Sequence, residues 1–320
     1  MTALLDHLPQ AVRTQLTRRS LWGTLPRPIA PAPAFGPGSP PLLAFSFDLD
    51  YQADTDALPG LLDLLAEAGV SATMFSIGRL VQDDPAPYRR AAEAGHEIGN
   101  HTWSHPDNPV LNPDREFWHL SEAEMVDEIG RAQDALERDT GRRPTTFRAP
   151  HFKDAWPLRA ALAVFPELTC VSSALDSKCP RPTPYVPVDA PVAGDLSLHF
   201  PKRGAEDDAL LMLPLTACPG LRWSPFCSYS GIREPRNAAA GAGVLGPDEW
   251  ERRWSTMLER AAPRGYASVY FEPLDVMRHD ATRACFRRMI DAAQAGGWRL
   301  TTLAEVEAAW RPVVCGAVSP

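Results

Sequence analysis

Two histidines and two aspartates in this sequence have the types and spacing of a metal site. His101 and His105 stand four positions apart in His-Thr-Trp-Ser-His, and Asp48 and Asp50 precede them in Phe-Asp-Leu-Asp. Two imidazoles at that spacing can converge on one cation from a helical turn or a tight loop, and an upstream carboxylate completes a set of three ligands. Three protein ligands leave coordination positions for water and substrate, which is typical of a catalytic metal and not of a structural one.

A plainer interpretation stays open for each pair. Eight histidines in 320 residues will often fall four positions apart by chance. Aspartates after a strand more often cap a helix or form a turn than bind a metal. The choice between a metal site and these plainer interpretations therefore depends on the predicted strands and helices around these residues.

The apolar run over residues 42–47 predicts a buried strand that ends at the aspartates. Alternation along a strand places Asp48 and Asp50 on the same side and Leu49 on the other, so both carboxylates can face one site. A short strand over residues 96–100 leads into the histidine pair. Such strand ends are where barrel enzymes keep their catalytic groups.

A third strand end carries an arginine. A strand over residues 145–147 precedes Arg148. A guanidinium at this position can point into the site and orient a carboxylate such as Asp48. The alternative is a surface arginine that interacts with solvent.

Helical and apolar segments alternate along the chain, which predicts parallel βα units in an α/β fold with the site loops at one end. The helix over residues 121–139 opens with a capping box of Ser121 and Glu124, and the helix over residues 58–68 ends at Gly69. The other predicted helices cover residues 88–94, 248–261, 281–295 and 303–310, and the other predicted strands cover residues 72–77, 267–271 and 298–300.

The composition is that of a globular protein. Its length predicts one large barrel domain over residues 42–312 behind an N-terminal arm and Pro-rich connector over residues 1–41, and a division into two domains is left open. A net charge of -8 and a pI near 5.5 argue against a nucleic-acid partner. No stretch approaches the roughly 20 apolar residues that span a bilayer, and the N-terminus has no export segment. We therefore expect a cytoplasmic protein without a membrane partner. Its six cysteines lack CxxC spacing and are expected to be reduced.

The stretch from about residue 170 to residue 246 is less regular. Short apolar runs alternate there with Pro, Gly and aromatic residues, which suits irregular loops or a small sheet over a barrel mouth. Trp223 and Tyr229 are candidates for binding substrate, as are Pro150 and His151 near the arginine. The alternative is that such side chains belong to the core.

The order of these segments resembles the polysaccharide deacetylase superfamily, carbohydrate esterase family 4. The likeness rests on Phe-Asp-Leu-Asp, on Gly-His-Glu-Ile-Gly-Asn-His-Thr-Trp-Ser-His-Pro over residues 95–106, and on Phe-Arg-Ala-Pro over residues 147–150. It covers roughly residues 42–310 and is strongest over residues 42–152. The resemblance implies a distorted (β/α) barrel with about seven parallel strands, and metal-dependent hydrolysis of an amide bond.

By this resemblance, Asp50, His101 and His105 hold zinc or another divalent transition metal. Asp48 is then the general base for the attacking water, and Arg148 tethers Asp48. The Asp-Leu-Asp spacing departs from the adjacent Asp-Asp of secreted chitin and peptidoglycan deacetylases. It resembles the intracellular branch of the superfamily, which includes allantoinase-like and cyclic-imidase-like members.

One departure from the family pattern concerns the proton donor. The superfamily presents a histidine at a strand end near the C-terminus, where this sequence has Glu272 in Val-Tyr-Phe-Glu-Pro. A glutamic acid can act as the general acid if apolar surroundings raise its pKa. His199 and His279 are the alternative donors.

We therefore expect a hydrolase of carbon–nitrogen bonds that deacetylates a small N-acetylated sugar or glycoside, or opens a cyclic amide. Its partner is then a small-molecule substrate, and assembly into a homo-oligomer is left open. The alternative from another class is a catalytically degenerate barrel that binds a ligand or a partner protein. Glu272 is the chief support for that alternative.

Overall fold

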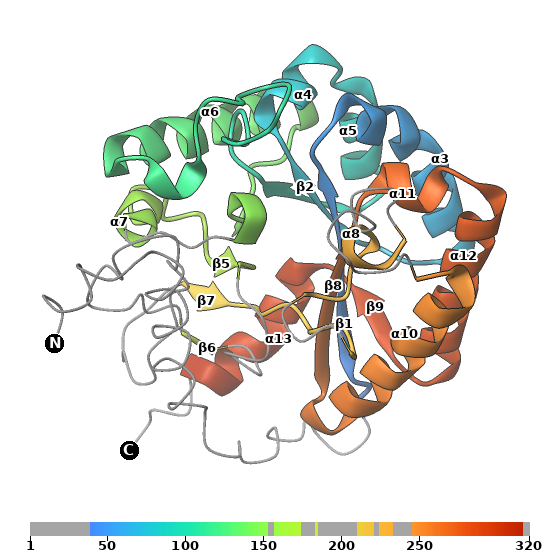
Figure 1. The fold of residues 1–320 in the computed structure, drawn as a ribbon. Coiled ribbons are helices and arrows are strands. Elements are labelled where there is room, and N and C mark those ends of the chain that lie inside the picture. Colours follow the sequence, from blue (N-terminus) through green and yellow to red (C-terminus); the bar gives the residue numbers. More distant parts are fainter. Residues whose placement is uncertain are drawn as a thin grey trace, which may run out of the picture.

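The computed structural model describes residues 39–152, 157–173, 183–184, 210–220, 224–232 and 245–315. Within these residues the strands form one curled sheet, and helices pack around its outside (Figure 1). The strands are β1 (Leu42–Leu49), β2 (Thr73–Ser76), β3 (Glu97–Asn100), β4 (Thr146–Phe147), β5 (Cys170–Val171), β6 (Thr183–Pro184), β7 (Leu211–Met212), β8 (Tyr266–Phe271) and β9 (Arg299–Thr301). The α-helices are α3 (Gln52–Ala68), α4 (Gly78–Asp83), α5 (Ala86–Glu93), α6 (Glu122–Thr140), α7 (Leu158–Leu162), α8 (Ser228–Gly231), α10 (Pro247–Ala261), α11 (Pro273–Met277), α12 (Asp280–Ala295) and α13 (Leu303–Cys315), and the 3-10 helices are η1 (Phe117–His119), η2 (Pro150–Phe152) and η3 (Ala262–Arg264).

The sheet runs in the order β6-β7-β5-β4-β3-β2-β1-β8, and β9 pairs with β1 as well. All neighbours from β7 to β8 pair in parallel, whereas β6 is antiparallel to β7. After β7 the chain passes along the free edge of β8, where Thr216 N donates to Ser268 O (2.8 Å). The prediction of an α/β fold with a distorted barrel of about seven parallel strands is confirmed.

Strand β1 lies at the centre of the structure, and both of its faces are covered. Every residue of the strand is buried. Phe45 and Phe47 point outward and pack on Phe271 and Phe286, with ring centroids 5.3–6.1 Å apart. By alternation, the side chain of Asp48 points to the opposite face, into the barrel.

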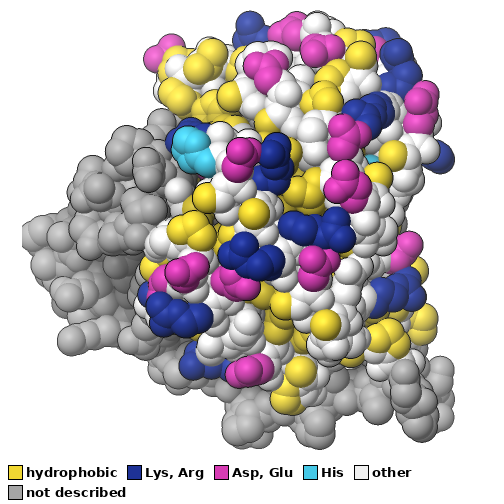
Figure 2. All heavy atoms as spheres, turned by 90° about the vertical axis from the view of Figure 1, so that its right-hand side faces the viewer, with side chains coloured by type: hydrophobic (Ala, Val, Ile, Leu, Met, Phe, Trp, Pro, Cys, Tyr) yellow, Lys and Arg dark blue, Asp and Glu magenta, His cyan; other side chains and the backbone are white. Residues whose placement is uncertain are grey.

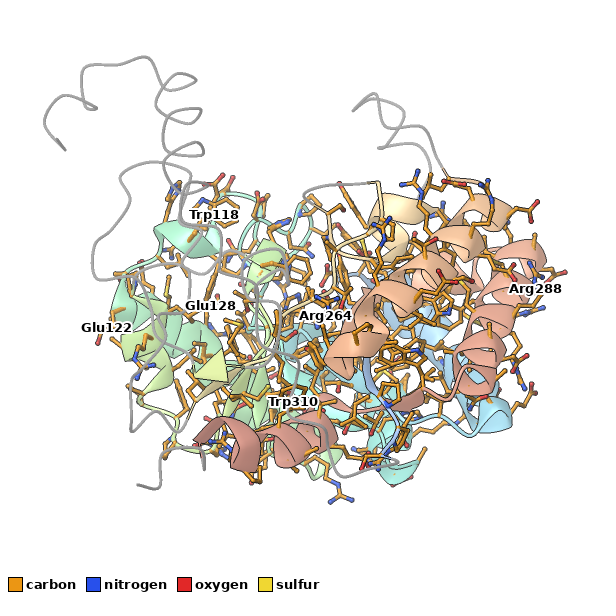
Figure 3. The ribbon with its side chains drawn as sticks, turned by 90° about the horizontal axis from the view of Figure 1, so that it is seen from below. Trp118, Glu122, Glu128, Arg264, Arg288 and Trp310 are labelled. Atoms are coloured by element: carbon orange, nitrogen blue, oxygen red, sulfur yellow. The ribbon has the colours of Figure 1, made fainter. Side chains whose placement is uncertain are left out.

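Helix α13 covers the barrel end opposite the carboxyl ends of the strands (Figure 3). Its first turn is tied to the beginnings of β2 and β3, because Leu303 N donates to Thr73 Oγ1 (2.8 Å) and Ala304 N donates to Glu97 Oε2 (3.0 Å). Trp310 of the same helix is fully buried. Apolar packing thus closes this end, and the catalytic candidates lie at the other.

Helix boundaries follow the capping residues. Ser121 and Glu124 form the predicted capping box of α6, and α3 ends at Gly69, whose left-handed φ of 64° suits a residue without a Cβ. The predicted start of α3 at Leu58 is wrong, because the helix begins at Gln52. Its first turn is polar, and the carboxylate of Asp54 stabilises it from within the helix.

Several predicted features lie outside the described residues. They include most of the N-terminal arm, up to residue 38, and most of the irregular stretch between residues 174 and 244. The described parts of that stretch contribute β6, β7 and α8. β6 and β7 belong to the main sheet, so they do not form the separate small sheet over the barrel mouth that was one of the two expectations for this stretch.

On the face that carries α10 and α12, basic and acidic side chains alternate, and neither charge forms a separate patch (Figure 2). Exposed ion pairs such as Arg288 with Glu251 (2.8 Å) account for part of this pattern. Among the described residues, no helix is long and apolar enough to cross a bilayer.

Candidate active site

Parallel pairing brings residues from distant parts of the chain to one end of the barrel. Asp48 stands at the end of β1, His101 follows β3, Arg148 follows β4 and Glu272 follows β8. The strands run in the same direction, so their carboxyl ends meet at one edge. The sequence-predicted polar residues therefore converge.

Asp50, His101 and His105 face one another. Asp50 Oδ1 lies 3.3 Å from His101 Nε2 and 3.9 Å from His105 Nε2, and the candidate ligand atoms all lie within 4.8 Å of one another. Two nitrogen donors at the usual zinc distance in tetrahedral geometry are about 3.4 Å apart. The three side chains thus already have the spacing of a metal-binding set.

The ring hydrogen bond of His101 leaves its Nε2 for a ligand. His101 Nδ1 lies 2.8 Å from the carbonyl oxygen of Arg148. A carbonyl only accepts, so Nδ1 carries the proton, and a neutral His101 has its lone pair on Nε2. Within the described part of the chain, the buried atoms Asp50 Oδ1 and His105 Nδ1 have no hydrogen-bond partner. An unsatisfied carboxylate oxygen between two imidazoles fits a site for a cation.

Charge in the site also fits a divalent cation. Burial acts to raise the pKa of Asp50, but His105 and His101 together hold it below its ordinary value. Burial lowers the pKa of His105 to about 3, whereas Asp50 and Asp48 raise that of His101 against the effect of burial. The Arg148 guanidinium pairs with Asp48, so the charge of Asp50 has to be balanced by a proton on His101 or by a bound metal ion.

The histidine loop is held in a strained conformation. Thr102 and His105 have left-handed φ values of 68° and 48°. Thr102 N donates to Asn100 Oδ1 (2.8 Å), and His105 N donates to Thr102 Oγ1 (3.0 Å). The sequence left open whether a helical turn or a tight loop carries the pair, and the structure has a loop. Such strain persists only where the surroundings enforce it.

Arg148 is fully buried and tethers Asp48. Its Nη1 donates to Asp48 Oδ1, its Nη2 to Ser46 Oγ (2.9 Å) and Ser172 Oγ (3.0 Å), and its Nε to Ser172 O (3.1 Å). The guanidinium also lies over the ring of Phe75, 4.0 Å from its centroid. Burial raises the pKa of Asp48, although the charge of Arg148 opposes it. This geometry fixes Oδ1 of Asp48 and leaves Oδ2 to interact with other groups.

Glu272 is placed beside Asp48 by strand register. Phe271 of β8 pairs with Phe47 of β1, so the next residues, Glu272 and Asp48, stand level on neighbouring chains and point to the same face. Glu272 is buried, and its backbone N–H donates to Ser228 Oγ (2.9 Å). His279, one of the alternative proton donors, lies at the exposed start of α12, and His199 lies outside the described residues.

The predicted substrate-binding residues have different surroundings. Pro150 is buried next to the arginine. His151 is half-exposed at the site, with its ring centroid 5.2 Å from that of His105 and its Nε2 3.2 Å from Asp107 Oδ2. Tyr229 is 38% exposed on α8. Trp223 lies outside the described residues.

Three residues that the sequence analysis did not single out hold the ligands in place. Asp54 Oδ2 accepts from the backbone N–H of Asp50 (3.1 Å), and Asn108 Nδ2 donates to the carbonyl of Asp50 (2.7 Å). Glu128 of α6 binds Ser104 in the histidine loop. Asp54 could have been found as an acidic residue in the first helical turn, whereas Asn108 and Glu128 have no comparable sequence pattern.

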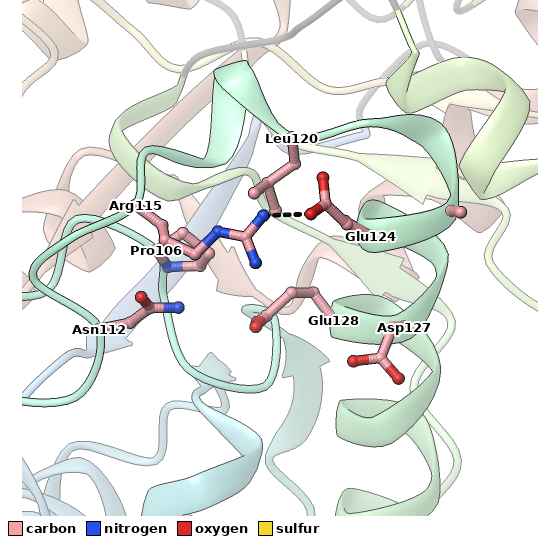
Figure 4. A pocket seen from close by; sticks show the side chains of 8 residues that line it. Pro106, Asn112, Arg115, Leu120, Glu124, Asp127 and Glu128 are labelled. Atoms are coloured by element: carbon pink, nitrogen blue, oxygen red, sulfur yellow. Dashed lines mark hydrogen bonds and ion pairs between the residues drawn. The ribbon is translucent and has the colours of Figure 1, made fainter.

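A pocket of about 250 Å³ lies between the chain that follows the histidine loop and α6 (Figure 4). Arg115 forms an ion pair with Glu124 across it, and Glu128 reaches into it from the helix. The lining residues are Pro106, Asn112, Arg115, Leu120, Ala123, Glu124, Asp127 and Glu128. The pocket therefore adjoins the residue after His105 but contains none of the candidate metal ligands.

Comparison with known proteins relates the first half of the chain to one family. The profile of the family described as polysaccharide deacetylase matches residues 36–160. Peptidoglycan-N-acetylglucosamine deacetylase PgdA from Listeria monocytogenes is 36% identical over 109 residues, which are 34% of this chain and 21% of the relative. The similarity thus spans about a fifth of that protein's length.

Solved structures extend the likeness to nearly the whole chain. A candidate polysaccharide deacetylase from Mycobacterium smegmatis has a TM-score of 0.68 at 21% identity, covering 90% of this chain and 96% of the other. PuuE allantoinase has a TM-score of 0.63 at 13% identity, covering 91% and 99%. At these identities the structures show a shared fold, which the allantoinase-like branch has in common with the deacetylases. Residues 36–160 are thus similar in sequence to the polysaccharide deacetylase family, and the described residues share the fold of a solved structure described in the same way.

Proposed function

We propose that this protein hydrolyses the N-acetyl amide of an amino-sugar substrate with the help of a bound divalent cation, zinc in the first place. The observation that carries the proposal is the convergence of Asp50, His101 and His105 beside an Asp48 that Arg148 holds in place. Similarity to that family and to a relative named as a deacetylase supports the reaction type.

Asp50, His101 and His105 would hold the cation. Bound there, it would polarise the amide carbonyl and offset the negative charge that develops on its oxygen. Asp48 accepts a proton from the attacking water through Oδ2, because Arg148 occupies Oδ1. The raised pKa of Asp48 makes it a stronger base than a solvent-exposed aspartate.

Glu272 is the proposed proton donor. The C–N bond breaks as the nitrogen takes a proton, so the products are acetate and a free amine. Glu272 stands level with Asp48 on the neighbouring strand, so both carboxyl groups face the same site. Glu272 is buried at the site, so its carboxyl group is shielded from bulk water.

The proposed substrate is a small N-acetylated sugar or glycoside, and a cyclic amide is the second choice. Similarity to a peptidoglycan deacetylase supports an N-acetylated sugar as the substrate. The fold shared with an allantoinase supports a cyclic amide as the second choice. A degenerate barrel without activity is not favoured, because the donor set and the tethered aspartate are all present.

The test is acetate release from N-acetylglucosamine, its short β-1,4 oligomers and a cyclic ureide by zinc-loaded protein. Asp48→Asn should lower kcat by about 10³-fold or more and keep one zinc per chain, since general-base and orientation effects are lost together. His101→Ala should lose both zinc and turnover. The exposed Asp56→Asn on α3 is the matched control. Near wild-type turnover by Asp48→Asn would overturn the assignment of the base.

A further inference from the structure

The carboxylate of Glu128 is buried, with 9% of the residue exposed, and both of its oxygens bind the same residue. Ser104 N donates to Glu128 Oε2 (2.9 Å), and Ser104 Oγ donates to Oε1 (2.7 Å). Among the ion pairs of the described residues, none involves Glu128. A buried carboxylate is costly unless it is hydrogen-bonded, and here Ser104 supplies both bonds.

Ser104 stands between two backbone positions that need outside support. Thr102 and His105 on either side have left-handed φ values, which cost about 1–2 kcal/mol each for residues with a Cβ. Ser104 Oγ also accepts from Asn112 Nδ2 (2.8 Å). The serine is therefore fixed at its backbone and at its hydroxyl, immediately before a candidate metal ligand.

The same helix contacts the histidine loop at further points. Asn100 Nδ2 donates to Ile129 O (3.0 Å) and to Gln133 Oε1 (2.9 Å), both on α6. The guanidinium of Arg131 lies over the ring of Trp103, 4.4 Å from its centroid. One face of α6 thus holds the loop at its beginning, in its middle and just before its second histidine.

We propose that Glu128 is a positioning residue for the metal site, an inference that rests on the proposed metal-dependent function. Its carboxylate fixes Ser104, and through the adjoining peptide it fixes the backbone of His105, so that Nε2 of His105 faces Asp50 before a cation binds. Figure 4 shows Glu128 reaching from α6 toward the loop, with Asp127 beside it on the same helix. Glu128 acts on the affinity for the metal and leaves the chemical step unchanged.

The experiment measures the zinc dissociation constant by chelator competition for wild type, Glu128→Ala, Glu128→Gln and Asp127→Ala. Glu128→Ala should weaken zinc binding about 10- to 100-fold, the usual effect of losing an outer-shell partner. Glu128→Gln should stay within about 3-fold, because its amide oxygen accepts from Ser104 N and its amide nitrogen can donate to Ser104 Oγ. Asp127→Ala is the matched control, since Asp127 lines the same pocket and its carboxylate pairs with the exposed Arg131 (3.5 Å) and not with Ser104.

A second readout separates positioning from general stability. A role in stability alone would lower the melting temperature of the metal-free protein and leave the zinc dissociation constant unchanged, and that result would overturn the inference. Equal losses in Glu128→Ala and Asp127→Ala, or no rescue by Glu128→Gln, would overturn it as well. If Glu128→Ala does not fold, Ser104→Ala gives the same test by removing one of the two bonds. Absence of zinc binding by wild type would instead refute the proposed function itself.

Discussion

The candidate site has two sides that differ in how many functional side chains they present. On the metal side, the backbone N–H and carbonyl of Asp50 are both bonded to side chains, and His101 is bonded through its ring. On the opposite side, the backbone N–H of Glu272 donates to Ser228 Oγ, and its carbonyl accepts from Asp275 N (3.0 Å) in the first turn of α11. The first side presents an array of fixed ligands, and the second presents one carboxyl group at a strand end.

This difference follows from what each side would do. Metal ligands have to converge within a few tenths of an ångström, and a preformed set avoids the free-energy cost of ordering them when the ion binds. A proton donor needs only to come within hydrogen-bond reach of the leaving nitrogen. The family match ends at residue 160 and therefore covers the metal side but not β8. Three variants test whether the two sides can be changed independently of each other.

The largest expected effect is on the side with one carboxyl group. Glu272→Gln should lower kcat about 10²- to 10⁴-fold, because it removes the proposed acid, while zinc binding stays within about 2-fold. Steady-state kinetics and metal content on the same preparation provide both numbers. Glu272→His is the companion variant, and it should recover part of kcat if proton donation limits the rate. Loss of zinc in Glu272→Gln would show that the two sides are not separable.

An intermediate effect is expected at the residue that joins the sides. Asp54 Oδ2 accepts from Asp50 N (3.1 Å) and Tyr51 N (3.0 Å), and Oδ1 accepts from Leu274 N (3.0 Å) on the segment after Glu272. In Asp54→Asn, one carboxylate oxygen is replaced by an NH₂ group, which cannot accept a hydrogen bond from a backbone N–H. At least one of these contacts must therefore break.

Asp54→Asn should therefore reduce kcat/KM about 10- to 100-fold, with zinc affinity and kcat both affected. Asp56→Asn on the exposed face of the same helix is the control. An Asp54→Asn protein that loses zinc affinity alone, with kcat at saturating zinc unchanged, would limit the role of Asp54 to the metal side.

The smallest effect on catalysis is expected at His96, which precedes β3. Its Nδ1 accepts from Ala72 N (3.1 Å), and burial lowers its pKa from 6.5 to about 4. Below about pH 6.5 this histidine is therefore protonated in the unfolded chain but stays neutral in the folded protein. The stabilisation is complete above that pH and is lost as the pH falls toward the folded pKa.

From about pH 7.5 to about pH 5, this histidine should account for about 2 kcal/mol of lost stability. Urea denaturation of wild type and His96→Asn across that range measures it, since the Asn oxygen can still accept from Ala72 N. Parallel pH profiles of the two proteins would refute the assignment. Zinc binding near pH 7.5 should be the same in both.

Much of the fold could be predicted because its signals are local. The apolar runs over residues 42–47 and 267–271 became β1 and β8, and the Ser121 capping box became the start of α6. The two-residue strands β5, β6 and β7 were not predicted as members of the sheet, because their pairing depends on neighbours far along the chain. The polar start of α3 was missed for a related reason, since its stabilising carboxylate lies inside the helix.

The candidate site divides in the same way. Asp50, His101 and Arg148 belong to short sequence patterns, and the structure brings them together. Their supports do not belong to such patterns, because Glu128 is 24 positions from Ser104 and Asn108 is 58 positions from Asp50. A single sequence carries no trace of a contact across that distance when the residue types are as common as Ser, Asn and Glu.

The attachment of the histidine loop to α6 has a consequence for protein engineering. The loop, the helix and Arg148 follow one another along the chain, and His101 Nδ1 bonds to the carbonyl of Arg148 at the end of the series. A graft of the five-residue histidine pattern onto another barrel would lack the contacts that impose its left-handed positions. A transferable unit has to include α6, and it has to include the start of α4 as well, because Gly78 N and Arg79 N donate to the carbonyls of Thr102 and Trp103 (3.0 Å each).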